Sequence, residues 1–530
     1  MVNSSSYPDR PSTEKAPAAR PPGQRDANVP ALLARQAVGH SDKLALSAVS
    51  GGSRRVCLTY RQLHDECQAA AGVLREAGLK AGDRLGIYLT NEWGIECFVG
   101  ALGALALGAV VVPFNTRAAA GELRHAVELT EPRFIVAERD GQRHLAQALE
   151  EVAPPFLDPI YCNVAPGTSG VAQCDIASDA LGCLLFTSGT TARAKAVMHS
   201  HATMLATGVT TGGALGLRAG DIYQGAFPFF TSSALNLAGM SCWVAGAGLV
   251  VEGQVDNEGR LALIEKAKTT FYHGVPSILN FMMQTYSPER HDMGRLRTVA
   301  AGGAALAQEL SDRITRNWPW VEQMQIYGMT ESGPAGTVLD PDMRSLKAGS
   351  VGRAMNGMEL EVLDDAGQPV PPGEMGEIAL TGPSVALGYY RNPEATQAAF
   401  SGRIILTGDV GQVDDHGYLF FGDRKKDLIN RGGLKIASVG VENVLYQHPG
   451  VSEAAVIAIP HRDLGEDIAA CIVAMPGAEP SEAELIAHCR TVLADYQIPR
   501  HIRFYDSLPK NPLGKIVKTE LRARWQAGPS

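Results

Sequence analysis

Residues 60–89, YRQLHDECQAAAGVLREAGLKAGDRLGIYL, indicate the fold class of this chain. Apolar residues recur at helical spacing from Leu63 to Leu74, and Gly78 follows at a position typical of a helix C-cap. A Gly-Asp-Arg turn at residues 82–84 then leads into the apolar run 85–89, which is typical of a short buried strand. The alternation of helix, turn and strand continues to about residue 340 and predicts doubly wound α/β layers.

Further along the chain the pattern becomes richer in short strands. After Gly349, strands separated by Gly and Pro are expected at residues 359–363, 376–380, 403–406 and 417–421, which predicts a small β-barrel-like unit. Beyond a charged Asp-Arg-Lys-Lys-Asp run at residues 423–427, a mixed region has expected strands at 454–459 and 469–473 and an expected helix at 482–493. We therefore expect an α/β protein with a large N-terminal domain, residues 29–423, and a small mobile α+β C-terminal domain, residues 424–530.

Length and composition place the chain among ordinary globular proteins. Its 530 residues suggest about three folding units at roughly 100–200 residues each. It is 45% hydrophobic and 19% charged, and its formal net charge of -9 argues against a nucleic-acid partner, which normally needs a basic face. The nine cysteines include no C-x-x-C pair, which argues against a disulfide framework or a zinc site and favours a cytoplasmic protein.

Two segments resemble targeting or membrane signals. Residues 97–114 carry no charge over 18 positions, but glycines and the run Val110 to Val112 predict a buried helix, a glycine stop and a buried strand rather than a membrane span. Residues 1–28 mix Ser, Pro, Ala and Arg without an apolar core. We expect them to form a flexible leader and not a secretory signal.

The densest cluster of polar side chains follows an apolar strand at residues 184–195, LLFTSGTTARAK. Small residues let backbone N–H groups converge, and hydroxyls with a lysine suit phosphate oxygens. The spacing is not that of the common phosphate loop, and taken alone a Ser/Thr-rich loop is more often a plain turn. The candidate phosphate-binding residues are Thr187, Ser188, Gly189, Thr190, Thr191 and Lys195.

Further blocks follow in order: QIYGMTE at 325–331, LTGD at 406–409, GDRKKDLI at 422–429, GGLKI at 432–436 and PKNPLGKI at 509–516. Supporting blocks lie at 113–117, 199–201 and 301–304. Together they resemble the ANL superfamily of adenylate-forming enzymes over about residues 29–522. This superfamily comprises acyl-CoA synthetases, peptide-synthetase adenylation domains and luciferases. The GGLK block is more similar to the acyl-CoA synthetase (acid–CoA ligase) branch.

The resemblance implies a two-step, AMP-forming ligase reaction. With Mg²⁺ and ATP, a carboxylate attacks the α-phosphate, releasing pyrophosphate and leaving an acyl-adenylate. Coenzyme A then displaces AMP to give the acyl-CoA thioester. Such chemistry depends on positioning and on neutralisation of charge.

The same resemblance assigns roles to individual residues. It implies that the 187–195 loop holds the pyrophosphate end, that Tyr327 stacks on adenine and that Asp409 binds the ribose hydroxyls. The adenine slot would be lined by Gly302, Gly303 and Ala304, with Arg424 beside Asp409. The catalytic residues would be Thr330 at the α-phosphate, Glu331 as the Mg²⁺ ligand and Lys515 bridging carboxylate and phosphate. Outside these blocks, Tyr327 would be interpreted as core packing and the charged residues as solvated loop side chains.

The charged run before the C-terminal domain matches the family's hinge. The resemblance places the hinge at Lys426, about which the small domain rotates between the two half-reactions. One orientation inserts Lys515, and the other presents the thiol and coenzyme A region, Gly432, Gly433 and Lys435.

The chain departs from the family pattern at three places. Ala192, Ala194 and Ala196 stand where Gly, Pro and Gly are usual, and alanine at a glycine position carries a steric cost. Thr231 stands where a histidine normally follows the Phe-Pro-Phe-Phe block, and residues 436–442 lack the usual Ser-Pro and first Glu. An enzyme specialised for one half-reaction is therefore an alternative.

The acid is only coarsely indicated. Segments that line the acyl pocket in the family carry Phe229, Phe230, Thr231, Asn236 and His273, which favours an apolar aliphatic, aryl or polycyclic acid. Two alternatives stay open: transfer of the acyl group to an acyl carrier protein, and a nucleotide-binding protein that has lost adenylation. The sequence does not determine the oligomeric state; homodimers are the commonest soluble oligomers, so a homodimer is one expectation.

Overall fold

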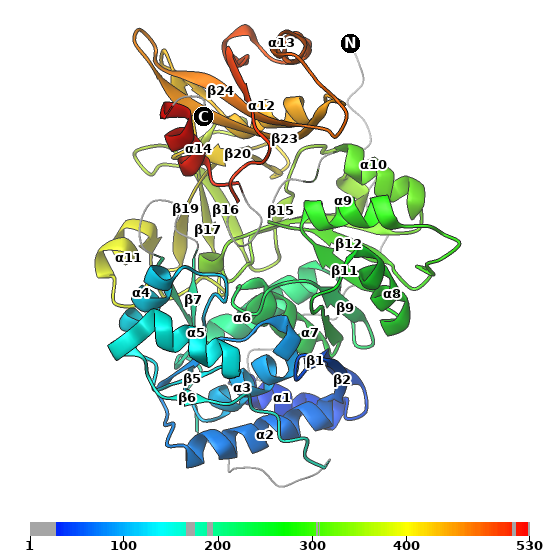
Figure 1. Ribbon diagram of the computed structural model, residues 1–530, viewed down its shortest axis with the longest axis vertical. Coiled ribbons are helices and arrows are strands. Elements are labelled where there is room, and N and C mark those ends of the chain that lie inside the picture. Colours follow the sequence, from blue (N-terminus) through cyan, green and yellow to red (C-terminus); the bar gives the residue numbers. More distant parts are fainter. Residues whose placement is uncertain are drawn as a thin grey trace.

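The computed structural model describes residues 28–165, 175–187, 194–303, 306, 308–510 and 516–527. In these segments the chain forms four sheets with helices between and around them, so the expected α/β class is confirmed (Figure 1).

The first α/β layer is a six-stranded sheet in the order β6-β5-β3-β4-β7-β8, parallel except for the β7–β8 pair. Its strands are β3 (Arg84–Ile87), β4 (Val110–Pro113), β5 (Phe134–Val136), β6 (Phe156–Leu157), β7 (Leu181–Phe186) and β8 (Ala196–Ser200). The helices of this region are α2 (Tyr60–Glu76), α3 (Gly94–Ala106), α4 (Ala120–Thr130) and α5 (Arg139–Leu149).

The second layer is a nine-stranded sheet in the order β15-β14-β13-β12-β11-β9-β10-β1-β2. Its strands are β1 (Leu44–Ser50), β2 (Arg54–Thr59), β9 (Ile222–Gly225), β10 (Gly248–Val251), β11 (Phe271–Gly274), β12 (Thr298–Ala301), β13 (Glu322–Tyr327), β14 (Thr337–Leu339) and β15 (Arg353–Ala354). The helices of this region are α1 (Val29–Gly39), α6 (His201–Ala214), α7 (Met240–Ala245), α8 (Asn257–Ala267), α9 (Pro276–Thr285) and α10 (Gln308–Asn317).

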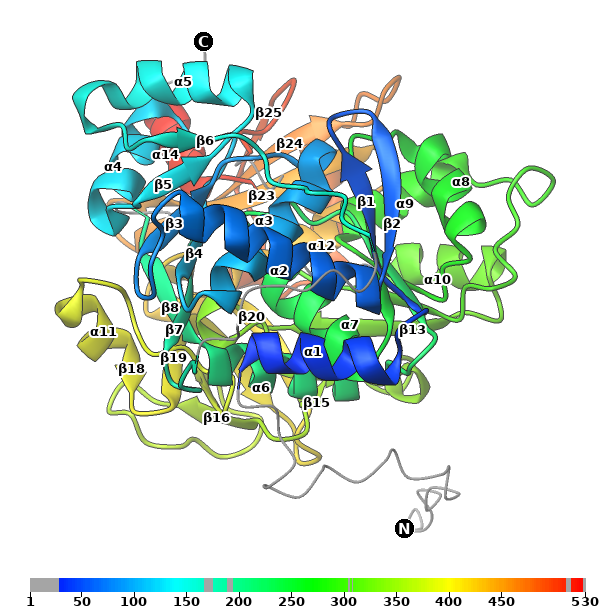
Figure 2. The same cartoon turned by 90° about the horizontal axis from the view of Figure 1, so that it is seen from below.

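Helices α2 and α3 lie between these two sheets (Figure 2). Thr59 begins α2 with a capping box to Gln62. A Cβ on Gly103 would lie 2.8 Å from the Ala70 Cβ, so the close packing of α2 on α3 requires glycine there. The uncharged segment forms buried helix α3, a turn at Gly108 and strand β4, as predicted. No helix within the described ranges combines the length and apolarity needed to cross a membrane.

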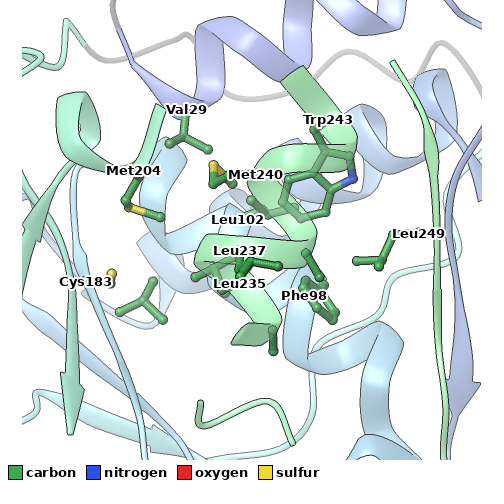
Figure 3. Close-up of a cluster of buried hydrophobic side chains, with 14 of the residues drawn as sticks. Val29, Phe98, Leu102, Cys183, Met204, Leu235, Leu237, Met240, Trp243 and Leu249 are labelled. Carbon is green, nitrogen blue, oxygen red and sulfur yellow. The ribbon is translucent and has the colours of Figure 1, made fainter. Parts of the chain in front are cut away.

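The main core packs where these helices meet the second sheet (Figure 3). Trp243 of α7 is fully buried, and its ring meets the edge of Phe98 of α3 at a centroid distance of 5.9 Å. Leu102, Met240 and Val29 surround them, which ties the first described helix to the centre of the large domain.

The predicted barrel-like unit corresponds to a five-stranded antiparallel sheet. Its elements are β16 (Glu359–Leu363), β17 (Gly376–Thr381), α11 (Pro393–Ala399), β18 (Phe400–Ser401), β19 (Ile404–Val413) and β20 (Leu419–Arg424). The C-terminal part lies over this unit in Figure 1 and has its own five-stranded sheet. Its elements are β21 (Ile429–Arg431), β22 (Leu434–Ile436), α12 (Ser438–Tyr446), β23 (Val451–His461), β24 (Gly465–Ala474), α13 (Glu482–Arg490), β25 (His501–Phe504) and α14 (Lys518–Gln526).

Candidate active site

The carboxyl ends of parallel strands in the second sheet gather the first group of predicted residues. Strands β11, β12 and β13 are parallel neighbours, so Gly302 and Tyr327 emerge at the same edge. A Cβ on Gly302 would lie 2.9 Å from His273 Nε2 and 3.0 Å from Ile326 Cγ1, and Gly303 has φ +79°. Glycine is therefore required at this edge, and it keeps the backbone open beside Tyr327.

Tyr327, Asp409 and Arg424 meet at one carboxylate. Asp409 and Arg424 are directly paired across β19 and β20, and Arg424 Nε lies 2.8 Å from Asp409 Oδ1. The Tyr327 hydroxyl donates to Asp409 Oδ2 at 2.7 Å. Burial and the neighbouring Asp409 charge raise the pKa of Tyr327, so the phenol stays protonated as a donor. The structure thus brings together three predicted nucleotide residues from distant segments.

Glu331 lies in the short 3₁₀ turn Thr330–Ser332, just after β13. Its side chain is buried, and the Tyr389 hydroxyl donates to Glu331 Oε1 at 2.9 Å. Burial raises the pKa of Glu331, while the Tyr389 hydrogen bond and the positive charges of Arg424 and Lys195 oppose that shift. A buried carboxylate in this setting is suited to binding a cation, which would stabilise its ionised form.

Tyr389 was not predicted from the sequence. Lys195 Nζ lies 4.5 Å from the centre of the Tyr389 ring, a cation–π contact. The next residue, Tyr390, donates its N–H to Ala196 O at 2.8 Å, which fixes the 384–392 loop against β8. Tyr389 therefore connects the predicted metal ligand Glu331 with Lys195. In the sequence, the Gly-Tyr-Tyr stretch at 388–390 is the feature that could have indicated this residue.

Thr330 is held on two sides. His199 Nε2 donates to the Thr330 carbonyl at 2.9 Å, and Ser232 Oγ lies 3.0 Å from Thr330 Oγ1. Burial lowers the pKa of His199 to about 4, so its ring is neutral near pH 7. His199 thus acts as a fixed donor to the backbone, and Ser232 is a second neighbour of the site that the sequence did not indicate.

The predicted acyl-pocket residues lie in and after strands β9 and β11. Phe229 is buried against Phe98 at a ring-centroid distance of 5.0 Å. The Thr231 hydroxyl donates to Pro228 O at 2.8 Å and stabilises a turn. The Tyr223 hydroxyl and His273 Nδ1 form a hydrogen bond, and the His273 and Phe227 rings pack edge to face with their centroids 4.7 Å apart.

Two further members of this set differ in burial. Asn236 is fully buried, with its Oδ1 3.7 Å from the Cys183 Sγ, whereas Phe230 is only partly buried. Because His273 also lies under Gly302, the buried members connect to the nucleotide edge.

On either side of the predicted phosphate-binding loop, strands β7 and β8 pair in antiparallel fashion. Thr187 donates its N–H to Lys195 O at 3.0 Å, and Ala196 begins β8 paired with Phe186. Ala196, which stands where glycine is usual, has no positive φ, so the alanine there carries no strain of a left-handed backbone. The predicted residues Ser188, Gly189, Thr190, Thr191, Ala192, Ala304 and Lys515 lie outside the described residues.

The C-terminal residues form a separate group. Gly432 and Gly433 make the turn between β21 and β22 with φ of +60° and +88°, which favours glycine. Lys435 Nζ lies 3.6 Å from Asp365 Oδ2 of the large domain. Lys426 lies in the exposed turn between β20 and β21.

Comparison with known proteins defines the class. The family model described as AMP-binding enzyme matches residues 33–390, and the model described as AMP-binding enzyme C-terminal domain matches residues 440–515. The chain therefore belongs to the AMP-binding, adenylate-forming family, in its acid–CoA ligase branch.

Individual relatives cover nearly the whole chain. A long-chain-fatty-acid–CoA ligase, FadD13 of Mycobacterium tuberculosis, is 32% identical over 91% of this chain and 96% of its own length. A feruloyl-CoA synthase of Amycolatopsis is 32% identical over 88% and 94%. The crystal structure of ATP-bound MatB from Rhodopseudomonas palustris is 29% identical, with a TM-score of 0.82 over 95% of this chain and 99% of that one.

Proposed function

We propose that this acid–CoA ligase activates an apolar carboxylic acid in two steps. The acid's carboxylate oxygen forms a bond to the ATP α-phosphorus, and the bond to pyrophosphate breaks. The coenzyme A thiol sulfur then bonds the acyl carbon, AMP leaves and the thiol proton is released. The observation that supports this function most strongly is the convergence of Tyr327 and Arg424 on the buried carboxylate of Asp409, with the buried Glu331 as a second carboxylate of the site.

Residue roles follow from this arrangement. Asp409 is held by a phenol and a guanidinium, so a bound ribose finds the carboxylate already oriented and negatively charged. The open backbone at Gly302 and Gly303 leaves room beside Tyr327 for adenine. We assign Thr330 to the α-phosphate, Thr187 and Lys195 to the pyrophosphate end, and Lys515 to the bridge between carboxylate and α-phosphate.

The donor chemistry at Glu331 fits Mg²⁺, a hard cation that prefers carboxylate and phosphate oxygens. The side chain is buried with a raised pKa, so a neighbouring cation would stabilise its ionised form. When bound, Mg²⁺ supplies positive charge that neutralises phosphate oxygens. The Tyr389 hydroxyl orients the carboxylate by holding Oε1.

The buried side chains of the predicted acyl segments favour an apolar acid. Phe229 is aromatic and Asn236 is neutral. Burial lowers the pKa of His273 to about 3, so this imidazole is uncharged near pH 7 and offers no cation to a second carboxylate. An aliphatic, aryl or polycyclic monocarboxylic acid is therefore the substrate class that we propose.

We also propose that the chain divides into domains 29–423 and 424–530 with a hinge near Lys426. Asp423 Oδ2 accepts hydrogen bonds from the Ser438 N–H at 2.6 Å and from the Ser438 hydroxyl, across the proposed hinge. Ser438 in turn contacts Lys518, which pairs with Glu442 at 2.7 Å. Rotation of the small domain about residue 426 would have to break the Asp423–Ser438 contact.

Product identification tests the function. Enzyme, Mg-ATP, coenzyme A and a panel of aliphatic, aryl and polycyclic acids are incubated together, and the products are identified by mass spectrometry. Acyl-CoA with AMP is the expected result. Acyl-AMP without acyl-CoA would instead favour transfer to an acyl carrier protein. If neither product forms, thioester made from synthetic acyl-AMP would identify a thiolation enzyme, and its absence a nucleotide-binding protein.

A further inference from the structure

Ser232 is held rigidly beside the proposed adenylation site. It is partly buried and directly precedes the π-helix Ser233–Gly239. Its carbonyl accepts the Leu237 N–H at 3.0 Å, and the preceding Thr231 N–H donates to Pro228 O at 2.9 Å. The backbone on both sides of Ser232 is therefore fixed, and its hydroxyl reaches Thr330 Oγ1 at 3.0 Å.

The Thr330 backbone is fixed independently of Ser232. His199 Nε2 and the Gly333 N–H both donate to the Thr330 carbonyl, at 2.9 Å and 3.1 Å. These contacts position the main chain, but they do not determine the direction of the Thr330 hydroxyl proton. Among the described contacts, the Ser232 side chain is the one that lies within hydrogen-bonding distance of the Thr330 hydroxyl.

We propose that Ser232 is a positioning residue for adenylation: its hydroxyl donates to Thr330 Oγ1 and directs the Thr330 proton toward the α-phosphate. This inference rests on the proposed function and on the role assigned there to Thr330. A hydroxyl has one proton, so Thr330 can donate to phosphate only if the proton shared with Ser232 comes from Ser232. Consecutive hydrogen bonds also polarise one another, which strengthens the second donor.

The neighbouring residues supply matched controls. The Thr231 hydroxyl is already engaged with Pro228 O, so it is not equivalent to Ser232. No described side-chain hydrogen bond involves Ser233, although it is adjacent and equally small. Ser233→Ala therefore makes the same chemical change one residue away, without removing a contact to Thr330.

The test separates adenylation from thiolation. Acid-dependent exchange of pyrophosphate into ATP is measured for Ser232→Ala, Ser232→Thr and Ser233→Ala, alongside thioester formation from supplied acyl-AMP and coenzyme A. We expect Ser232→Ala to lower kcat for exchange about tenfold, the usual effect of one lost hydrogen bond, with KM for ATP changed less than about threefold. Ser232→Thr should restore exchange, and Ser233→Ala should match the unmodified enzyme.

A double variant tests whether Ser232 acts through Thr330. In a Thr330→Val background, Ser232→Ala should lower exchange by less than about twofold, since the partner hydroxyl is already gone. An equal loss in both backgrounds, or a Ser232→Ala enzyme with unchanged kcat, would overturn the proposal. Failure of the proposed function is distinct, because the unmodified enzyme would then show no acid-dependent exchange.

Discussion

The large N-terminal part of the molecule and the small C-terminal part hold their polar side chains in different settings. In the large part, Asp409 and Glu331 are buried beside the main core. Asp409 accepts a hydrogen bond from Tyr327, and Glu331 accepts one from Tyr389. In the small part, the hydrophobic clusters contain only residues after 428, so none of the described clusters crosses the proposed boundary. Polar contacts of Ser438 and Lys435 connect it to the large domain.

The difference separates a site whose side chains are already bonded to one another from a domain for which we propose rotation. Buried and mutually bonded side chains need little ordering when a nucleotide binds. Polar contacts between domains exchange readily for water, whereas a shared apolar core would resist movement. Binding by the large domain and reorientation of the small one are therefore expected to respond to different substitutions.

The largest effect is expected at Asp409. In Asp409→Asn the ribose loses a charged acceptor, and Arg424 loses its partner. We expect kcat/KM for acid-dependent pyrophosphate exchange to fall about 100-fold, the loss of charged hydrogen bonds worth roughly 3 kcal/mol. Asp365→Asn, which changes a carboxylate beside the small domain, is the control. Equal losses in the two variants would remove the distinction between the regions.

A smaller and different effect is expected at the Asp423–Ser438 contact. Ser438→Ala keeps the backbone hydrogen bond to Asp423 and removes the hydroxyl, so it should act more weakly than Asp423→Asn. We expect both variants to broaden the distribution of distances between fluorescent labels on the two domains. Pyrophosphate exchange should change by less than acyl-CoA formation. An unchanged distance distribution in Asp423→Asn would contradict a hinge near Lys426.

Protonation of His273 provides a test of burial in the large domain. Its pKa is about 3 in the folded chain, against an ordinary value near 6.5, so below about pH 6.5 the unfolded chain takes up a proton that the folded chain does not. His273 therefore lowers the free energy of unfolding as the pH falls from about 6.5 to 3, by up to roughly 1.4 kcal/mol per pH unit. His273→Asn should make Tm depend less steeply on pH between 7 and 5. An identical slope would show that His273 is accessible in the folded state.

The smallest effect is expected at the exposed contact between Asp365 and Lys435. Their charged atoms are 3.6 Å apart on exposed side chains, and such ion pairs contribute about 0–1 kcal/mol. Lys435→Gln should leave pyrophosphate exchange within about twofold. A much larger loss would indicate that Lys435 contacts a substrate during adenylation.

The sequence allowed much of the fold to be predicted because its periodicities are local. Helix α2, the uncharged α3–β4 segment and the strands β16, β17, β19 and β20 lie where apolar spacing and glycine predicted them, whereas the two-residue strand β18 was not predicted. Tyr389 and Ser232 were not predicted, because their contacts join positions 58 and 98 residues apart in the chain. The steric cost expected for alanine at a glycine position does not arise as backbone strain at Ala196, because this residue lies in strand β8 without a positive φ, which residue identity alone does not reveal.

We propose above that the large domain forms an acyl-adenylate from an apolar acid. Isotope exchange between pyrophosphate and ATP, measured without coenzyme A and with the acid panel, tests it most directly. We predict exchange that requires an acid, is strongest with apolar monocarboxylates and is lost in Asp409→Asn. Exchange that stays at background with every acid, in an enzyme that still binds ATP, would contradict it.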